Sequence, residues 1–383
     1  MTDVTPFLIE ATEAELGDLR RRLRTTRWPE PETVDDWSQG VPLGYLKDFV
    51  GYWARDYDWR SREAQLNRFP QYKTRLADLD IHFIHVRSEH EHALPLLITH
   101  GWPGSIVEFQ KILEPLTDPR AHGGEERDAF HVVCPSLPGY GFSDKPPVRG
   151  YGVERIAELW DALMARLGYA HYVAQGGDWG AAVTTQIGMQ NRGRCRGIHL
   201  NMPLATAPPE AAKNPSADEI KALAARKRYR DTESGYAIVQ STRPQTLGYN
   251  LVDSPAGQAA WILEKFCSWT DCDGHPENVL TRDELLDNIM LYWLPANGAS
   301  SARLYWESFN KSFAASAEQV HVPTGCSLFA RELSQPPREW VLRRYPKLIY
   351  WNELPKGGHF AAFEQPQLFV DELRRCFRLM RAG

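Results

Sequence analysis

This sequence lacks the features of a membrane-spanning, secreted or nucleic-acid-binding protein. No run is apolar over the roughly 18 positions that a membrane-spanning helix needs. The first residues, M-T-D-V-T-P-F-L-I-E, contain neither the basic region nor the long apolar region of a signal peptide. The net charge of -5 disfavours binding to nucleic acid or to an anionic membrane. We therefore expect a cytoplasmic protein with no membrane anchor.

The sequence also lacks a cysteine pattern that would indicate a metal or disulfide framework. Its six cysteines are scattered and form no C-x-x-C pair. Histidines crowd in I-H-F-I-H-V-R-S-E-H-E-H (81–92), which could hold a metal ion. No histidine pair at helical spacing and no flanking cysteine supports such a ligand set, so we interpret this segment as a strand ending in a polar hairpin turn. We expect no metal and no cofactor.

What is present is an alternation of strand and helix patterns after a helical first quarter. Apolar spacing predicts helices over 10–26, 43–55 and 61–75, ahead of any strand. The alternation that follows is typical of a mostly parallel sheet with helices on both faces. The predicted strands span 78–87, 94–99, 129–134, 171–175, 322–331 and 346–351, and the helices among them span 105–115, 153–167 and 366–381. Residues 204–315 interrupt this order with helices and proline-rich joints, as an inserted lid would.

One strand–turn–helix junction contains an unusual central residue. H-Y-V-A-Q (171–175) is typical of a strand, and the stretch that follows G-G-D-W-G (176–180) is typical of a helix. An α/β-hydrolase presents its nucleophile at such a turn, with the pattern G-x-S-x-G, but here the centre is Asp178. The flanking Gly176 and Gly180 meet the need of the strained turn for small neighbours. A plain helix N-cap is the alternative role for Asp178.

Two more motifs stand where a hydrolase places its other groups. In H-G-W-P-G-S (100–105) the N–H of Trp102 is one expected oxyanion-hole donor, since Pro103 has none, and the N–H of Trp179 is the other. G-G-H-F-A-A-F-E-Q-P (357–366) places His359 after the last predicted strand, where a catalytic histidine belongs. The alternatives are an ordinary Gly-Pro turn and a loop histidine without a catalytic role.

The third member of a triad should be an acid between the nucleophile and the histidine in chain order. Glu332 follows the predicted strand that contains V-P-T-G-C-S-L-F-A (322–330), 27 positions before His359. Glu353 is nearer to His359 in sequence but follows the last strand. We rank Glu332 first and keep Glu353 as the alternative.

Together these motifs resemble the microsomal-type epoxide hydrolases, a branch of the α/β-hydrolase family, over nearly the whole chain. The resemblance implies an α/β-hydrolase fold in three parts. These are an N-terminal helical and meander segment (1–92), a core (93–203 and 316–383) and a helical cap (204–315). Animal members begin with a membrane anchor, which this sequence does not show, so the resemblance is to a soluble bacterial version.

The resemblance also implies the roles of individual residues. Asp178 would be the nucleophile, and His359 with Glu332 would activate water. The blocks E-S-G-Y (233–236) and R-L-Y-W-E (303–307) are similar to those that carry two cap tyrosines, so Tyr236 and Tyr305 would face the epoxide oxygen.

An aspartate suits attack on a saturated carbon that bears a leaving group, and it is already ionised at neutral pH. We therefore expect hydrolysis of an epoxide to a vicinal diol through an Asp178 ester, with water as the second substrate. Trp102, Trp179 and Phe360 would line an apolar pocket for a hydrophobic or aryl epoxide. Aromatic hydrocarbon catabolism, detoxification and antibiotic biosynthesis are all compatible roles, and a homo-oligomer is compatible too.

Three alternatives stay open. A haloalkane dehalogenase also uses an aspartate, a histidine and an acid, and Trp179 would suit a halide; release of halide rather than diol would identify it. A serine esterase is disfavoured because G-x-S-x-G is missing from the turn. A non-catalytic binding protein of the same fold would usually have lost a triad member, whereas all are present here.

Overall fold

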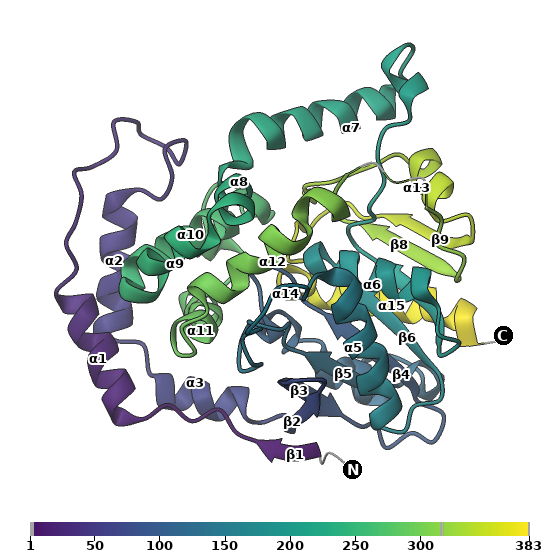
Figure 1. Ribbon diagram of the computed structural model, residues 1–383, viewed down its shortest axis with the longest axis horizontal. Helices are drawn as coiled ribbons and strands as arrows, with labels where there is room; N and C mark the ends of the chain where they lie inside the picture. The colour runs from purple at the N-terminus through teal and green to yellow at the C-terminus, as the bar shows by residue number, and fades with distance from the viewer. Residues whose placement is uncertain (1–3, 315, 317, 382–383) are drawn as a thin grey trace.

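The computed structural model describes residues 4–314, 316 and 318–381. Within them a nine-stranded sheet has the order β1-β2-β3-β5-β4-β6-β7-β8-β9 (Figure 1). Every pair from β5 to β9 is parallel, while β1, β2, β3 and β5 pair antiparallel, which confirms the predicted mostly parallel sheet. The strands are β1 (Val4–Phe7), β2 (Gln71–Leu76), β3 (Leu79–Val86), β4 (Leu94–Thr99), β5 (Phe130–Pro135), β6 (Tyr172–Gly176), β7 (Cys195–Leu200), β8 (Thr324–Leu328) and β9 (Leu348–Glu353).

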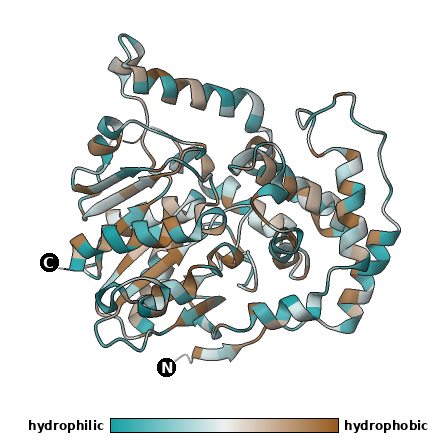
Figure 2. Cartoon of the chain, turned by 180° about the vertical axis from the view of Figure 1, so that it is seen from behind, coloured by the Kyte–Doolittle hydropathy of each residue, from teal (hydrophilic) through white to brown (hydrophobic). Residues whose placement is uncertain are grey.

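Helices cover both faces of this sheet, and successive residues of β7 show why. A Cβ on Gly188 of α6 (Asp178–Gln190) would lie 3.4 Å from Ile198 Cδ1. The preceding residue, Gly197, faces the other way, where a Cβ would lie 2.3 Å from Met380 Sδ of α15 (Pro366–Arg381). Successive strand residues point to opposite faces, so one helix packs on each side. Helix α6 lies in front of the sheet in Figure 1, beside α5 (Val153–Arg166), and Figure 2 shows α15 on the opposite face.

The N-terminal quarter contains the helices α1 (Glu13–Arg24), α2 (Leu43–Arg55) and α3 (Trp59–Leu66). A capping box begins α1, in which the Glu15 N–H donates to Thr12 Oγ1 and the Thr12 N–H donates to Glu15 Oε2. The prediction of helices ahead of any strand was wrong here, because β1 precedes α1 and the helix expected over 61–75 ends at Leu66. Pro70 disfavours a continued helix, and residues 71–76 pair with β1 and β3 instead.

Two further expectations differ from the structure, and one strand was not predicted. The turn after β3 is no hairpin, because β5 lies between β3 and β4 in the sheet. The helix expected over 105–115 is a 3₁₀ turn (Ile106–Phe109) followed by the short α4 (Leu113–Thr117). Strand β7 has no clear signal in C-R-G-I-H-L, since the glycine and arginine interrupt its apolar pattern, and parallel partners on both sides form it.

Between β7 and β8 the chain leaves the sheet and forms a layer of helices, which lies to the upper left of the sheet in Figure 1. One buried hydrophobic cluster joins this layer to the sheet and to the N-terminal helices, so the three parts share a core. The helices of the layer are α7 (Ala217–Arg228), α8 (Gly235–Thr242), α9 (Pro244–Asp253), α10 (Pro255–Trp269), α11 (Arg282–Trp293) and α12 (Gly298–Ser312). The chain then returns to the sheet and adds α13 (Arg338–Arg344) and α14 (Ala361–Glu364) before α15.

Candidate active site

Asp178 occupies a sharp turn at the carboxyl end of β6, where it is also the first residue of α6. Its φ of +49° lies in the left-handed region, which a residue other than glycine adopts only under strain. The flanking glycines allow the turn to pack closely. A Cβ on Gly176 would lie 2.1 Å from the Gly180 carbonyl oxygen, and one on Gly180 would lie 1.9 Å from the Thr99 carbonyl oxygen. The turn therefore holds the Asp178 carboxylate at the edge of the sheet where parallel strands end.

The loop after β4 contacts this carboxylate directly. The Trp102 N–H donates to Asp178 Oδ1 at 2.8 Å. A Cβ on Gly101 would lie 2.2 Å from the same oxygen, so only glycine leaves room for the aspartate there. The Trp179 N–H belongs to the first turn of α6, where a backbone N–H has no acceptor within its own helix. Both expected donors thus stand in the backbone beside Asp178.

His359 and Glu332 come from the loops after β9 and β8 and meet at the same edge. His359 Nδ1 lies 2.8 Å from Glu332 Oε1, and Nε2 lies 3.4 Å from Asp178 Oδ2. The His359 and Glu332 side chains are 2% and 0% exposed, against 14% for Asp178. The His359 N–H donates to the Trp269 carbonyl at 2.9 Å, which ties the histidine loop to the end of α10. Nδ1 therefore faces Glu332 while Nε2 faces the aspartate.

The imidazole of His359 lies between two carboxylates, and this determines its charge. Burial disfavours the protonated ring, but the negative charges of Glu332 and Asp178 and their hydrogen bonds outweigh that effect. Together they raise the pKa of His359 well above its usual value. With both carboxylates ionised, the histidine is held as an imidazolium.

Tyr236 and Tyr305 come from α8 and α12 and lie buried across from the Trp102 loop. The Tyr236 ring stacks on the Trp102 ring, with centroids 4.8 Å apart and planes inclined by 9°. Tyr305 meets the Trp102 ring edge-on at 5.8 Å and the Trp179 ring edge-on at 4.8 Å. Burial, and to a smaller extent the charge of Asp178, raise the pKa of both phenols well above its usual value. Both hydroxyls therefore keep their protons at neutral pH.

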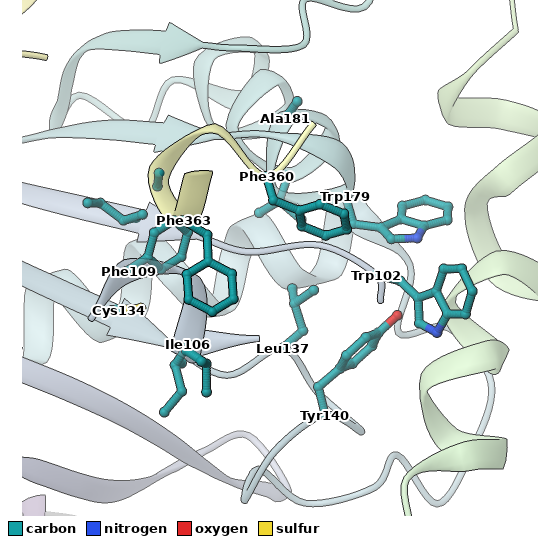
Figure 3. Packing of buried hydrophobic residues seen from close by; sticks show 14 of the residues in the cluster. Trp102, Ile106, Phe109, Cys134, Leu137, Tyr140, Trp179, Ala181, Phe360 and Phe363 are labelled. Carbon is teal, nitrogen blue, oxygen red and sulfur yellow. The ribbon is translucent and has the colours of Figure 1, made fainter. Parts of the chain in front are cut away.

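The remaining predicted residues also have defined places. The Trp102 and Trp179 side chains extend toward the helical layer in Figure 3, whereas Phe360 lies nearer the core. Phe360 stacks on Phe266 of α10 at 4.2 Å. Glu353, the alternative acid, is exposed at the end of β9 and accepts from Trp351 Nε1 at 3.1 Å. The structure brings Glu332 to His359 and leaves Glu353 on the surface.

Sequence reasoning missed three residues near this group. Tyr229, in a π-helical turn (Tyr229–Glu233), has its hydroxyl 3.0 Å from that of Tyr236. The Trp269 ring packs edge-on against His359 at 5.1 Å. Glu108, just after the H-G-W-P-G-S motif, is buried and lines a cavity beside Asp178. The one sequence signal for Glu108 was a charged residue within the apolar stretch I-V-E-F (106–109).

The histidines of β3 lie close to other polar side chains. His82 lies within 2.9 Å of Ser136 Oγ and Gln71 Oε1, and His85 lies 2.9 Å from the Tyr169 hydroxyl. Across the described residues, no three of the side chains that usually bind metals gather to form a site. Nor does any helix in the described ranges have the length and apolarity to cross a bilayer.

Comparison with known families identifies two matched regions of the chain. Residues 4–109 match the epoxide hydrolase N-terminus, and residues 95–247 match the α/β-hydrolase fold. The chain is 57% identical to the "Putative epoxide hydrolase" of Stigmatella aurantiaca, over 99% of this chain and 86% of that protein. It is 38% identical to epoxide hydrolase 1 of Sus scrofa, over 98% of this chain and 89% of that protein.

Solved structures agree with the sequence relatives. The juvenile hormone epoxide hydrolase of the silkworm Bombyx mori superposes with a TM-score of 0.92 at 33% identity, covering 100% of this chain and 96% of that one. The Aspergillus niger epoxide hydrolase superposes with a TM-score of 0.88 at 34% identity, covering 99% and 97%. The predicted α/β-hydrolase fold is confirmed, and the chain belongs to the epoxide hydrolase family.

Proposed function

We propose that this chain converts epoxides to vicinal diols through a covalent ester on Asp178. Its family membership supports the activity. One observation supports the mechanism above all: a carboxylate takes the nucleophile's place at the turn, between the Trp102 N–H and the imidazole of His359. An aspartate in that place can form an ester with a saturated carbon.

In the first step an Asp178 oxygen attacks one ring carbon of the epoxide. The carbon–oxygen bond of the ring breaks, and the developing alkoxide takes a proton from Tyr236 or Tyr305. Because burial keeps both phenols protonated, each can donate a hydrogen bond to the ring oxygen before the bond breaks. The products of this step are a hydroxyalkyl ester of Asp178 and a tyrosinate.

In the second step water cleaves that ester. Esterification removes the charge of Asp178, so the pKa of His359 falls and its imidazolium gives up the Nε2 proton, which returns the tyrosinate to a phenol. The neutral Nε2 can then accept a proton from water. Hydroxide attacks the Asp178 carboxyl carbon, and the N–H groups of Trp102 and Trp179 stabilise the oxyanion. The bond from this carbon to the substrate oxygen then breaks. One proton of the water restores the imidazolium of His359, which Glu332 stabilises, and the other passes to the product oxygen.

The substrate side of the site favours a hydrophobic or aryl epoxide. Aromatic rings contact the two tyrosines, namely Trp102, Trp179, Trp269 and Phe309. We assign the helical layer over 204–315 as the cap, since it carries both tyrosines. Cytoplasmic location, any homo-oligomer, and a role in detoxification or biosynthesis stay predictions from the sequence.

A dehalogenase reaction would use the same aspartate but no proton donor, because halide leaves without one. The two buried tyrosines across from Asp178 favour the epoxide reaction. Diol formation without halide release from matched epoxide and haloalkane substrates would separate the two.

The proposal is tested by the intact mass of the His359→Gln variant after incubation with styrene oxide. We expect a gain of one epoxide on the peptide that contains Asp178, because attack proceeds while water activation fails. Asp178→Ala is the control, and it should show neither an adduct nor turnover. Substantial turnover by Asp178→Ala, or no adduct on His359→Gln while the wild type forms diol, would contradict the ester mechanism.

A further inference from the structure

The hydroxyl of Tyr229 lies 3.0 Å from that of Tyr236, a contact that neither proposed step requires. Hydroxyl oxygens at this separation share a hydrogen bond, in which either oxygen can be the donor. Tyr229 begins the π-helical turn that separates α7 from α8, and Tyr236 is the second residue of α8. Such turns are rare and are often found at functional sites. This one brings two tyrosines that are seven positions apart into contact at their hydroxyls.

The two phenols differ in how readily each can hold a negative charge. Tyr236 is 6% exposed, whereas Tyr229 is only partly buried. Burial raises the pKa of Tyr229 to about 12, and the hydrogen bond with Tyr236 opposes that rise. Burial raises the pKa of Tyr236 well above its usual value, and the contact with Tyr229 adds to that rise. A negative charge within this pair is therefore more stable on Tyr229 than on Tyr236.

The charge of Asp178 links this pair to the first chemical step. In the free enzyme the Asp178 carboxylate contributes to the raised pKa of both Tyr229 and Tyr236, because it disfavours a second negative charge nearby. The charge of Glu233, at the end of the π-helical turn, also raises the pKa of Tyr229. Attack on the epoxide converts the Asp178 carboxylate into a neutral ester. The charge that opposes a tyrosinate is thus lost in the same step in which a tyrosine must release a proton.

We propose that Tyr229 replaces the proton that Tyr236 gives to the opening epoxide. The inference rests on the proposed function and concerns the proton transfer of its first step. As the carbon–oxygen bond of the ring breaks, the alkoxide takes the Tyr236 proton, and Tyr236 takes the Tyr229 proton along their hydrogen bond. Tyr236 ends the step as a phenol, and the tyrosinate is on Tyr229. Tyr305 keeps its proton and donates only a hydrogen bond to the same substrate oxygen.

The return of the proton uses the same path in reverse. The imidazolium of His359 gives its Nε2 proton to Tyr236, and the proton of Tyr236 moves on to Tyr229. Both tyrosines are then phenols again, and the number of protons in the pair is unchanged over the catalytic cycle. Tyr229 therefore acts through Tyr236 and does not need to touch the substrate.

The test measures the rate of ester formation by Tyr229→Phe in burst kinetics with styrene oxide. Phenylalanine keeps the ring and removes only the hydroxyl, so we expect this step to slow by about two- to tenfold. A double-mutant cycle supplies the second readout. In the Tyr236→Phe background the chain of hydroxyls is already broken, so Tyr229→Phe should cause no further loss. In the Tyr305→Phe background the loss caused by Tyr229→Phe should remain.

A solvent isotope measurement shows whether the Tyr229 proton moves. Two protons move together in the wild type, so its rate of ester formation should follow a curve as the fraction of D₂O rises. Only one proton moves in Tyr229→Phe, so the same plot should be a straight line. A residue that merely held Tyr236 in place would leave the wild-type plot straight.

Tyr249→Phe is the matched control, because Tyr249 is 67% exposed on α9, and it should leave ester formation unchanged. A straight wild-type plot, or an equal loss from Tyr229→Phe with and without the Tyr236 hydroxyl, would overturn the inference. If Tyr236→Phe slows ester formation and Tyr229→Phe does not, the inference alone fails. If neither Tyr236→Phe nor Tyr305→Phe slows it, the role of the tyrosines in the proposed function fails as well.

Discussion

The partnership between Glu332 and His359 leads to a quantitative prediction for Glu332→Gln. The pair is 2.8 Å apart and both side chains are at most 2% exposed, so water screens its interaction very little. Breaking a buried ion pair by removing one charge costs about 3–5 kcal/mol. At about 1.4 kcal/mol for each tenfold change in rate, ester hydrolysis should slow by roughly 10² to 10⁴. A glutamine NH₂ that donated to Nδ1 would also place the ring proton on Nε2, where it would block acceptance of a proton from water.

The assay separates the two steps in one experiment. The enzyme is mixed with excess epoxide, quenched in acid at set times, and the esterified fraction is measured by intact mass. We expect Glu332→Gln to form the ester at a rate close to that of the wild type and then to retain it. Glu353→Gln is the control, because Glu353 is exposed and distant from the histidine, and it should behave like the wild type. A Glu332→Gln variant that stays folded and hydrolyses the ester at the wild-type rate, or a loss of activity in Glu353→Gln, would refute this reasoning.

Two further predictions concern the tyrosines and the buried acid. Tyr236→Phe and Tyr305→Phe should each slow ester formation by roughly 10- to 150-fold, since a hydrogen bond to a developing charge contributes about 1.5–3 kcal/mol. Burst kinetics measure this step, and an unchanged rate of ester formation in either variant would contradict the role of that tyrosine. Because the folded pKa of Glu108, about 8, lies above its unfolded value of 4.5, the wild type should lose stability as pH rises from about 4.5 to about 8. Glu108→Gln has no such carboxyl group and lacks this loss. In denaturant titrations, its free energy of unfolding minus that of the wild type should therefore be larger at pH 8 than at pH 4.5. If this difference is the same at both pH values, the folded pKa of Glu108 is not raised.

The motifs allowed most of the candidate site to be predicted, but several strands and two nearby residues could not be predicted from the sequence. The glycine pair around Asp178 and the position of His359 after the last strand are local signals, and the strand that each acid follows ranked Glu332 above Glu353. The N-terminal strands were missed because β1 and β2 depend on pairing partners distant in sequence, and β7 depends on parallel neighbours on both sides. Tyr229 was missed because nothing in its local pattern separates it from a packing residue, and the only sign of Glu108 was a charged residue within the apolar stretch I-V-E-F (106–109).

The sequence by itself determined which groups can react: an aspartate in a strained turn, a histidine after the last strand, and backbone donors beside a proline that has none. These are properties of short stretches, so the sequence reveals them without knowledge of the segments that pack against them. Only the tertiary structure decided which groups meet. It set His359 between two carboxylates, brought Tyr236 and Tyr305 from a separate layer of helices over the site, and enclosed a polar cavity behind the aspartate. Those distances depend on packing between segments that lie far apart in the chain, such as those that contain Trp102 and Trp269, and no local pattern encodes them.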